Sequence, residues 1–328
     1  MPRETAAQPR RGAVVAILGL LCLVPPLVHN PYLLHLCILS MIYAMLGASW
    51  NLINGYAGIF TFGHQAFFGL GAYSSALLAM HSGLSPWITL WCGGVVAAFA
   101  GLVIGLPVLR IRSIAHVAII TLAFAVIVHA VVSNLPELTR GTLGLAGIPP
   151  FTPIVLPRLG TISFGAGASA ASYYVALAFL TLSAALLIWV VSGRTGLALR
   201  AIRDSEAAAA SLGVDPTRYK LLAFIVSSFV AGVAGAYYAH YLGVLTPESS
   251  IGVPIMITVL VITLVGGIGT TVGPLIGAFL VIIGLEVLRS VGDYRLMVYG
   301  VLLVLFVNFA PNGLAQLTLF DRRRGKRR

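Results

Sequence analysis

Long apolar runs, each almost free of charge, recur along this 328-residue chain and limit what it can fold into. Apolar residues make up 59% of the sequence and charged residues only 9%. A run of about 20 apolar residues can span the hydrocarbon core of a bilayer as a helix. The runs are continuous rather than alternating, which favours helices over barrel strands. The sequence therefore predicts an all-α polytopic membrane protein in which residues 1–328 form a single transmembrane domain.

Hydropathy predicts a bundle of about ten transmembrane helices. The first run, VVAILGLLCLVPPLV, follows basic residues and could be a signal peptide. It leads directly into HNPY and another apolar run without a small-residue cleavage site, so we interpret it as a retained helix. The expected spans lie at 12–29, 32–53, 59–80, 87–109, 113–133, 172–192, 220–243, 253–268, 273–290 and 296–312.

Positive charge is distributed unevenly across the predicted topology. The net charge of +11 would suit either a nucleic acid or an anionic membrane surface. Sixteen of the 20 Lys and Arg residues fall on the side that holds both termini, and six of these lie in the basic tail 313–328. Because basic residues are concentrated in cytoplasmic loops, we expect both termini in the cytoplasm and the loop 134–171 outside. The partner that this charge implies is the lipid bilayer, not nucleic acid.

Glycine is concentrated in two segments at membrane depth, NLINGYAGIFTFGHQAFFGLGAYSSALL and LVGGIGTTVGPLIGAFL. Such segments are typical of broken or re-entrant helices that line a cavity. Elsewhere, small residues recur at every fourth position and predict close packing of helix backbones. The two faces of this kind consist of Gly93, Ala97, Gly101 and Gly105, and of Ser228, Gly232 and Ala236.

The chain lacks the common motifs of enzymes and of nucleotide binding. There is no GxxxxGK[ST] loop, no HExxH or paired CxxC pattern, and no credible Ser-His-Asp set. The three cysteines, Cys22, Cys37 and Cys92, are isolated in apolar runs and are expected to pack structurally. We therefore predict that the chain is not an enzyme and binds no cofactor or metal itself.

Two classes of transporter remain open on these grounds, an ion- or proton-coupled carrier and a pathway driven by a separate energy source. An ion- or proton-coupled carrier usually has several acidic groups inside its spans, whereas Glu286 is the only one clearly inside a span here. Its spacing from Arg289 suits a local ion pair. A purely structural scaffold is disfavoured by the two glycine-rich breaks. The sequence thus predicts a membrane pathway whose energy comes from another protein.

Polar side chains near the breaks are candidates for the substrate pathway. Half-helix ends and side-chain amides can meet a zwitterion without full charges. His64 has two interpretations, a histidine bonded to a backbone carbonyl or a residue that lines the pathway. The candidates are Asn51, Asn54, Gly58, His64, Gln65, Gly267 and Gly269.

A charged segment interrupts the apolar pattern at 193–220. This elbow, GRTGLALRAIRDSEAAAASLGVDPTRYK, is predicted to form two short helices, the first capped by Thr195 and the second by Ser205. Gly213 is expected to end the second helix, and Asp215 to cap the following span. Its alanine-rich face, flanked by charge, suits a pocket on another protein, although a solvated loop is the alternative. Within the first helix, Arg200 and Asp204 are spaced for an ion pair.

The elbow and both glycine-rich segments resemble the permease subunits of branched-chain amino acid ABC transporters, the LivM-like family. The resemblance rests on GRTGLALRAIRDSEAAAASLGVDPTRYKLLAFIVSS, NLINGYAGIFTFGHQAFFGLGAYSSALL, VGGIGTTVGPLIGA and APNGL, and covers about residues 40 to 315. It implies an ATP-driven importer of branched-chain or similar hydrophobic amino acids in the bacterial inner membrane. Relatives that carry urea or short amides stay open as alternatives.

The resemblance also implies partners. These are a sister permease subunit, two cytoplasmic ATPase subunits that hold the Mg-ATP, and a binding protein in the periplasm, where the loop 134–171 would then lie. In this family the elbow docks on the ATPase, so 193–220 is expected to be a cytoplasmic coupling segment. The residues expected to take part in coupling are Arg200, Arg203, Asp204, Glu206, Ala207, Ala208 and Gly213.

Overall fold

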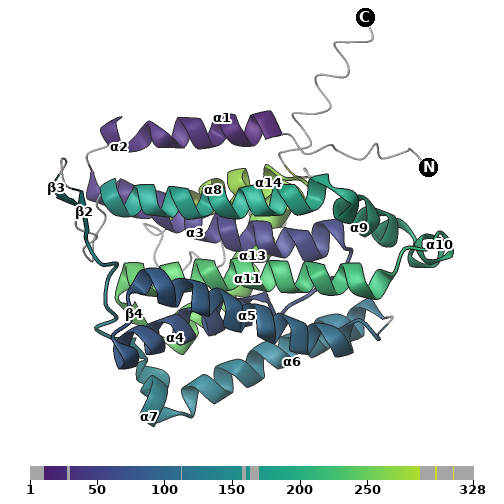
Figure 1. Ribbon diagram of the computed structural model, residues 1–328, viewed down its shortest axis with the longest axis horizontal. Coiled ribbons are helices and arrows are strands. Elements are labelled where there is room, and N and C mark those ends of the chain that lie inside the picture. Colours follow the sequence, from purple (N-terminus) through teal and green to yellow (C-terminus); the bar gives the residue numbers. More distant parts are fainter. Residues whose placement is uncertain are drawn as a thin grey trace, which may run out of the picture.

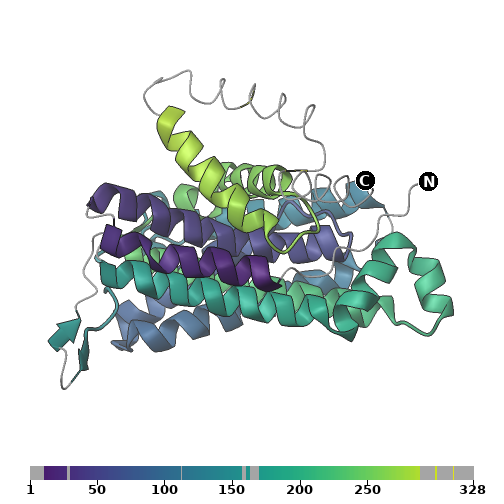
Figure 2. The same cartoon turned by 90° about the horizontal axis from the view of Figure 1, so that it is seen from above.

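Long helices run lengthwise through the molecule in the computed structural model (Figure 1). The structure describes residues 11–27, 30–111, 113–156, 160–162 and 170–288, together with residues 300 and 313. Two short helices, α9 (Arg194–Asp204) and α10 (Glu206–Ser211), project at one end of the bundle. The hairpin of β2 (Ile154–Leu156) and β3 (Gly160–Ile162) lies at the opposite end, in both views (Figures 1 and 2). The predicted elbow and the predicted outer loop are thus at opposite ends.

The bundle is helical as predicted, but the count of about ten spanning helices is not confirmed. Six helices among the described residues are long and apolar enough to cross a membrane. Hydropathy alone does not distinguish a spanning helix from a shorter apolar helix next to a break. The last expected span, 296–312, lies outside the described residues except for residue 300. The six are α3 with η1 (Pro31–Asn51 and Leu52–Tyr56), α5 (Pro86–Val108), α6 (Ile114–Ser133), α8 (Ala170–Ser192), α11 (Pro216–Leu242) and α12 with α13 (Pro247–Ile251 and Val253–Gly266).

The remaining apolar runs form shorter or more polar helices. The first run folds as α1 (Arg11–Cys22) and α2 (Val24–Leu27), and α1 lies beside α8 (Figures 1 and 2). The Tyr173 hydroxyl of α8 donates to the Leu21 carbonyl of α1 at 2.8 Å. Two further helices, α4 (His64–Ser82) and α14 (Gly273–Val287), each follow one of the predicted glycine-rich breaks.

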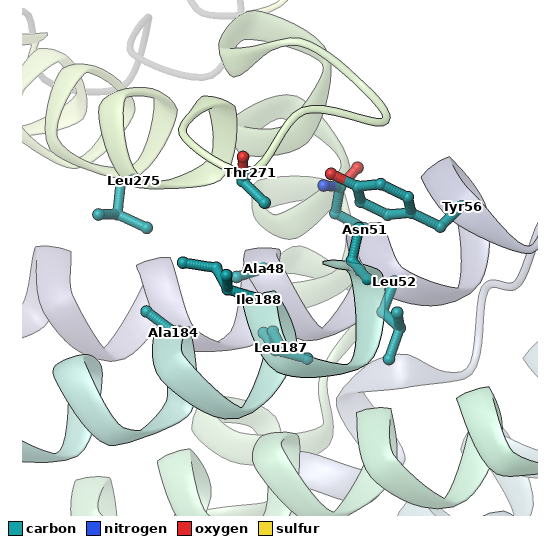
Figure 3. A pocket seen from close by; sticks show the side chains of 10 residues that line it. Ala48, Asn51, Leu52, Tyr56, Ala184, Leu187, Ile188, Thr271 and Leu275 are labelled. Carbon is teal, nitrogen blue, oxygen red and sulfur yellow. The ribbon is translucent and has the colours of Figure 1, made fainter. Parts of the chain in front are cut away.

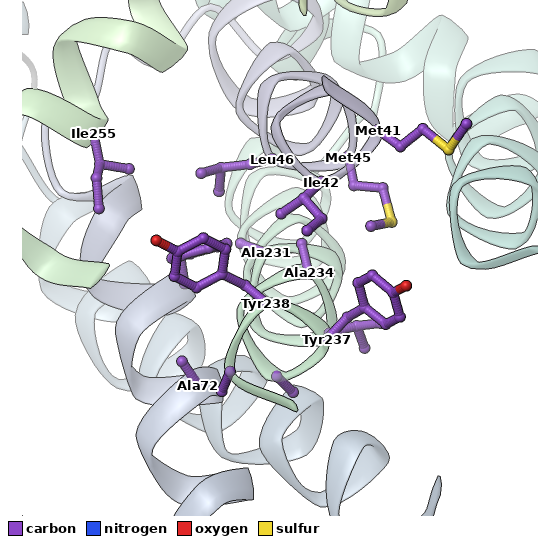
Figure 4. Packing of buried hydrophobic residues seen from close by; sticks show 14 of the residues in the cluster. Met41, Ile42, Met45, Leu46, Ala72, Ala231, Ala234, Tyr237, Tyr238 and Ile255 are labelled. Atoms are coloured by element: carbon purple, nitrogen blue, oxygen red, sulfur yellow. The ribbon is translucent and has the colours of Figure 1, made fainter. Parts of the chain in front are cut away.

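Small residues bring α4, α5 and α11 into close backbone contact, as their spacing predicts. A Cβ atom added at Gly71 of α4 would collide with the backbone of Gly232 in α11. A Cβ at Gly93 of α5 would lie 3.3 Å from the Cβ of Ala236 and 2.6 Å from the Gly71 carbonyl oxygen. We name this contact of Gly71, Gly93 and Gly232 the glycine seam. Around it, buried side chains from α3, α4, α11 and α13 form the main apolar core (Figure 4).

The connection between α6 and α8 folds back onto the end of α11. It contains α7 (Pro136–Thr139), η2 (Gly141–Leu143) and β1 (Leu145–Ala146), which pairs antiparallel with β4 (Val244–Leu245). The buried ring of His240 is 2.8 Å from the Pro149 carbonyl oxygen through Nδ1, and Phe151 stacks on Tyr237. These contacts attach the predicted outer loop to the bundle.

Both glycine-rich segments interrupt helices, as predicted. The first leaves the α-helix through a π-helical turn, η1, and then continues without regular helix until α4 begins at His64. The second separates α13 from α14 at residues 267–272. Gly58, Gly267 and Gly269 have φ angles of 71°, 113° and 74°, in the left-handed region that favours glycine. The segment 52–63, which includes η1, is called the first break below, and the segment 267–272 is called the second break.

Candidate functional site

The elbow is a pair of capped helices, and most of the predicted caps are present. The Ser205 hydroxyl accepts a hydrogen bond from the Ala208 amide, and the Asp215 carboxylate accepts from the Thr217 amide at 3.0 Å. Pro216 takes the first position of α11. Gly213 ends the second helix with a φ of 83°, as its position predicts. Local capping therefore gives this charged segment a defined shape.

Two predicted details of the first elbow helix are wrong. Thr195 does not cap α9, because the helix already begins at Arg194, with Gly193 as the capping residue and no side-chain bond. Arg200 does not pair with Asp204. Its guanidinium bends back and donates to the carbonyl of Gly196 at 3.0 Å and to that of Val191 at 3.3 Å. Backbone carbonyls near the end of α8 thus compete successfully with an exposed carboxylate.

An ion pair attaches the second elbow helix to α11. Lys220 Nζ lies 2.6 Å from Glu206 Oε2, and the lysine side chain is only 14% exposed. Glu206 is therefore already paired within the chain. The outer face of α10 remains open, since Ala208 and Leu212 are exposed, with Leu212 at 83%, whereas the exposed Ala207 lies on the side of the groove described next. This face is small, apolar and bordered by charge.

A groove of about 920 Å³ separates the elbow from the body of the bundle. Its walls are residues 57–60 of the first break, the α5–α6 connection around Arg110, the inner side of the elbow and the first turn of α11. Asp204, Glu206 and Lys220 contribute charge to the lining. The groove thus joins the elbow to the first break on the same end of the molecule.

Arg203 crosses this region and enters the break. Its Nη1 atom donates to the Gly55 carbonyl of η1 at 2.7 Å, while Nη2 lies 3.6 Å from the Asp204 carboxylate. A Cβ added at Gly58 would lie 2.7 Å from Arg203 Cγ, and one at Gly269 would lie 3.2 Å from Nη1. The side chain of one elbow residue therefore contacts both breaks and stays partly exposed.

Asn51 connects the two breaks to each other. Its side-chain amide donates to the Thr270 carbonyl at 2.8 Å and accepts from the Gly269 amide at 2.8 Å. Asn51 is 3% exposed, so its role in the structure is a buried bridge whose donor and acceptor are both occupied. Figure 3 shows it beside Tyr56 and Thr271, with which it lines a small, mostly apolar pocket. Sequence reasoning missed Tyr56 and Thr271, since neither has a distinctive spacing.

The contacts that Arg203 and Asn51 make with the two breaks are called the Arg203 junction, and most of the other predicted pathway residues lie apart from it. His64 is fully buried at the start of α4, with Nε2 2.8 Å from the Ser49 hydroxyl rather than from a backbone carbonyl. Gln65 is 1% exposed, and Asn54 is half-buried. The structure thus places Gly58 and Gly269 against Arg203, bonds Asn51 to Gly269, and leaves His64 and Gln65 on α4. Gly267 caps the end of α13.

Comparison with known proteins identifies the family. The sequence model of the family described as "Branched-chain amino acid transport system / permease component" matches residues 32–307, which include the elbow and both breaks. The chain belongs to this family of permeases. It is 34% identical to the high-affinity branched-chain amino acid transport system permease protein LivM of Escherichia coli K12, over 85% of this chain and 69% of that protein.

More distant relatives are also permeases. The chain is 26% identical to the LivH permease protein of the same E. coli system, over 84% of this chain and 92% of LivH. A shorter match, 36% identical over 32% of this chain and 31% of the relative, is to the autoinducer 2 import system permease protein LsrC of Enterobacter sp. strain 638. No solved structure gives a significant match.

The His, Cys, Asp and Glu residues of this permease form no metal-binding cluster in the described part of the chain. No set of three or more His, Cys, Asp or Glu residues there is arranged to hold a metal. The hydroxyl of Tyr32 donates to the Glu286 carboxylate. Arg289, the partner expected from the sequence, lies outside the described residues. Cys22, Cys37 and Cys92 are free thiols.

Proposed function

We propose that this permease forms part of the membrane pathway of an ATP-driven importer for branched-chain or similar hydrophobic amino acids. The observation that carries the proposal is the family match over residues 32–307, which includes an ordered, capped elbow. A sister permease would form the other half of the pathway, as the separate matches to LivM and LivH suggest. Two ATPase subunits would bind Mg-ATP, and a periplasmic binding protein would deliver the substrate.

The proposed orientation places the elbow in the cytoplasm of a bacterial cell, with the permease in the inner membrane. Its support is the charge distribution, with the basic tail and the elbow on one side of the predicted topology. The first turn of α1 faces the same end of the bundle as the elbow (Figure 1), and the α7 to β3 region lies at the other end. Both termini would then be cytoplasmic, and the loop 134–171 periplasmic.

The proposed ATPase contact is the open face of α10. Ala208 presents a small exposed side chain that a closely fitting pocket can cover, Leu212 adds apolar surface, and Ala207 borders the face on the side of the groove. Glu206 and Asp204 border this face with negative charge, which suits a basic rim on the partner. Arg200, Arg203 and Gly213 would support the contact by fixing the shape of the elbow.

The proposed substrate contacts are the polar groups at the start of α4. Thr61 Oγ1, His64 Nδ1 and Gln65 Oε1 are buried and have no hydrogen-bond partner among the described residues. Buried polar groups normally find partners, so unmatched groups point to contacts that form in another conformation. An amino acid zwitterion can provide both donors and acceptors. Asn51 and Asn54 would act mainly by shaping the adjacent break.

Reconstitution tests this function directly. The complete set of subunits in proteoliposomes should take up radiolabelled leucine when ATP and the loaded binding protein are present. The permease alone should neither hydrolyse ATP nor accumulate leucine under a proton gradient. Robust gradient-driven uptake by this chain alone would instead support the ion-coupled carrier class. Parallel assays with urea and a short amide would separate these substrate classes from leucine.

A further inference from the structure

Arg203 is the one elbow side chain that the structure shows bonded to the backbone of η1. Its guanidinium donates to the Gly55 carbonyl at 2.7 Å, across 148 positions of sequence. By contrast, Arg200 bonds within its own region, and Arg218 pairs with Asp215 at 3.0 Å at the start of α11. A charged donor within 2.7 Å of a carbonyl makes a strong, directional contact.

One glycine of each break lies against the Arg203 side chain, Gly58 beside its stem and Gly269 beside its guanidinium. At Gly58, an added Cβ would lie 2.7 Å from Arg203 Cγ, so a larger residue would displace the stem of the arginine. At Gly269, an added Cβ would lie 3.2 Å from both Arg203 Nη1 and the Gly55 carbonyl oxygen. The left-handed φ angles at Gly58 and Gly269 add a second reason for glycine. Both the room that the Arg203 side chain needs and the backbone conformation therefore require glycine at positions 58 and 269.

Asn51 extends the contact from the first break to the second. It is at the end of α3, directly before η1, and bonds both the Gly269 amide and the Thr270 carbonyl. A hydrogen bond of 2.7 to 2.8 Å weakens steeply when its atoms separate by about 1 Å. A larger displacement of α9 must therefore break the Arg203 contact, or move η1 and the second break together with the elbow.

We propose that Arg203 is the positioning residue through which the elbow sets the conformation of both breaks. This inference rests on the proposed function, in which the elbow carries the ATPase. When the ATPases move α9, the guanidinium moves the Gly55 carbonyl, and Asn51 transmits that movement to Gly269 and Thr270. A conformational signal then reaches α3 and α4 on one side and α13 and α14 on the other.

The first experiment measures coupling in the complete transporter reconstituted in proteoliposomes. R203A and R203K are compared with R194A, which removes an exposed arginine from the first position of the same helix. For R203A, we expect ATP hydrolysis to continue while leucine imported per ATP falls at least about tenfold, because a charge-assisted bond is lost. R203K keeps a charged donor and should retain an intermediate ratio. R194A should match the unsubstituted chain.

The second experiment reports on the break itself. In a chain whose three cysteines are replaced, Ile268→Cys places one half-exposed thiol in the second break. With Arg203 present, ATP should change the rate of maleimide labelling at this site by about threefold or more. With R203A in the same assembled complex, that ATP-dependent change should disappear. If R203A does not assemble, the same comparison is made with R203K, which should show a reduced change.

The outcomes separate this inference from the proposed function. If the unsubstituted complex fails to couple uptake to ATP, the proposed function is wrong, whatever Arg203 does. If the unsubstituted complex transports leucine, and R203A (or R203K, where R203A does not assemble) preserves both the uptake ratio and the labelling change, Arg203 is only a structural anchor and the inference is overturned. A loss of the labelling change with the arginine variants alone supports it.

Discussion

The glycine seam and the Arg203 junction both depend on glycine, but they use it differently. In the seam, Gly71, Gly93 and Gly232 let whole helix backbones approach, and the contact is one of backbone packed against backbone. In the junction, Gly58 and Gly269 make room for one charged side chain, and the contacts are a few directional hydrogen bonds. Close packing of backbones resists displacement, whereas a few hydrogen bonds can break and reform. The seam suits a fixed frame and the junction a movable link.

The largest expected effect comes from filling the seam. Gly232→Leu should strongly reduce the amount of folded protein in the membrane, since its Cβ alone would lie 3.0 Å from the Gly93 carbonyl oxygen and 3.1 Å from Gly94 Cα. Overpacking of this kind destabilises by about 1 to 3 kcal/mol or more. Membrane levels and thermal unfolding in detergent measure it. Gly284→Leu is the matched control, because nothing lies within 4 Å of that position.

Removing the bridge between the breaks should spare folding more than the seam variant does. Asn51→Leu deletes one hydrogen bond to the Thr270 carbonyl and one to the Gly269 amide. Each of these backbone groups, left buried and unpaired, costs about 1 to 3 kcal/mol of stability. We expect the protein to reach the membrane at reduced level and to lose most ATP-driven uptake. Asn51→Asp keeps the acceptor and should retain more uptake than Asn51→Leu. If both variants take up substrate as fast as the unsubstituted chain, the Asn51 hydrogen bonds between the two breaks are not needed for transport.

A change in the elbow should affect coupling more than folding. Gly213→Val forces a β-branched residue to a φ of 83°, a strain of about 1 to 2 kcal/mol confined to the end of α10. Membrane levels should stay near normal, while uptake stimulated by the binding protein falls. Gly193→Val makes the same substitution at an exposed elbow glycine with a φ of −88° and should have less effect. A larger loss of uptake in Gly193→Val than in Gly213→Val would contradict the proposed role of the shape of the elbow in coupling.

The smallest effect is expected at the ion pair of the second elbow helix. Glu206→Lys places two lysines together at the start of α10 and should loosen the helix from α11. The exchange of both residues, Glu206→Lys with Lys220→Glu, restores the pair and should recover part of the lost hydrolysis and uptake. No recovery in the double variant would mean that Glu206 acts through the ATPase rather than through Lys220.

Local and periodic features were predictable from the sequence. The fourth-residue spacing of Gly93, Ala97 and Gly101 anticipated the seam, because helical geometry alone puts these residues on one face. Ser205 and Asp215 anticipated the shape of the elbow, because capping depends on neighbouring residues. Helix faces and caps of this kind can be predicted without knowing which residues contact them from other helices.

The junction was not predictable in the same way. Nothing near Arg203 indicates that its partner is a carbonyl 148 positions away, and a carbonyl belongs to every residue. Asn51 was expected in the substrate pathway, because a polar side chain next to a break is available to bind substrate. In the structure, the backbone groups of Gly269 and Thr270 in the other break take up its hydrogen bonds instead. The predicted number of spans is not confirmed for a related reason, because hydropathy measures apolar content and not the position of a break.

The central claim, that the elbow end of the bundle meets the ATPase, is tested most directly by site-specific crosslinking. A single cysteine is introduced by Ala208→Cys on the open face of α10 or, as a control, by Leu143→Cys, which is 85% exposed in the predicted outer loop. Both variants are made in a chain without its three native cysteines and assembled with the partner subunits. Ala208→Cys should crosslink to the ATPase, at a yield that ATP changes, and Leu143→Cys should not. An ATPase adduct from Leu143→Cys and none from Ala208→Cys would contradict the account.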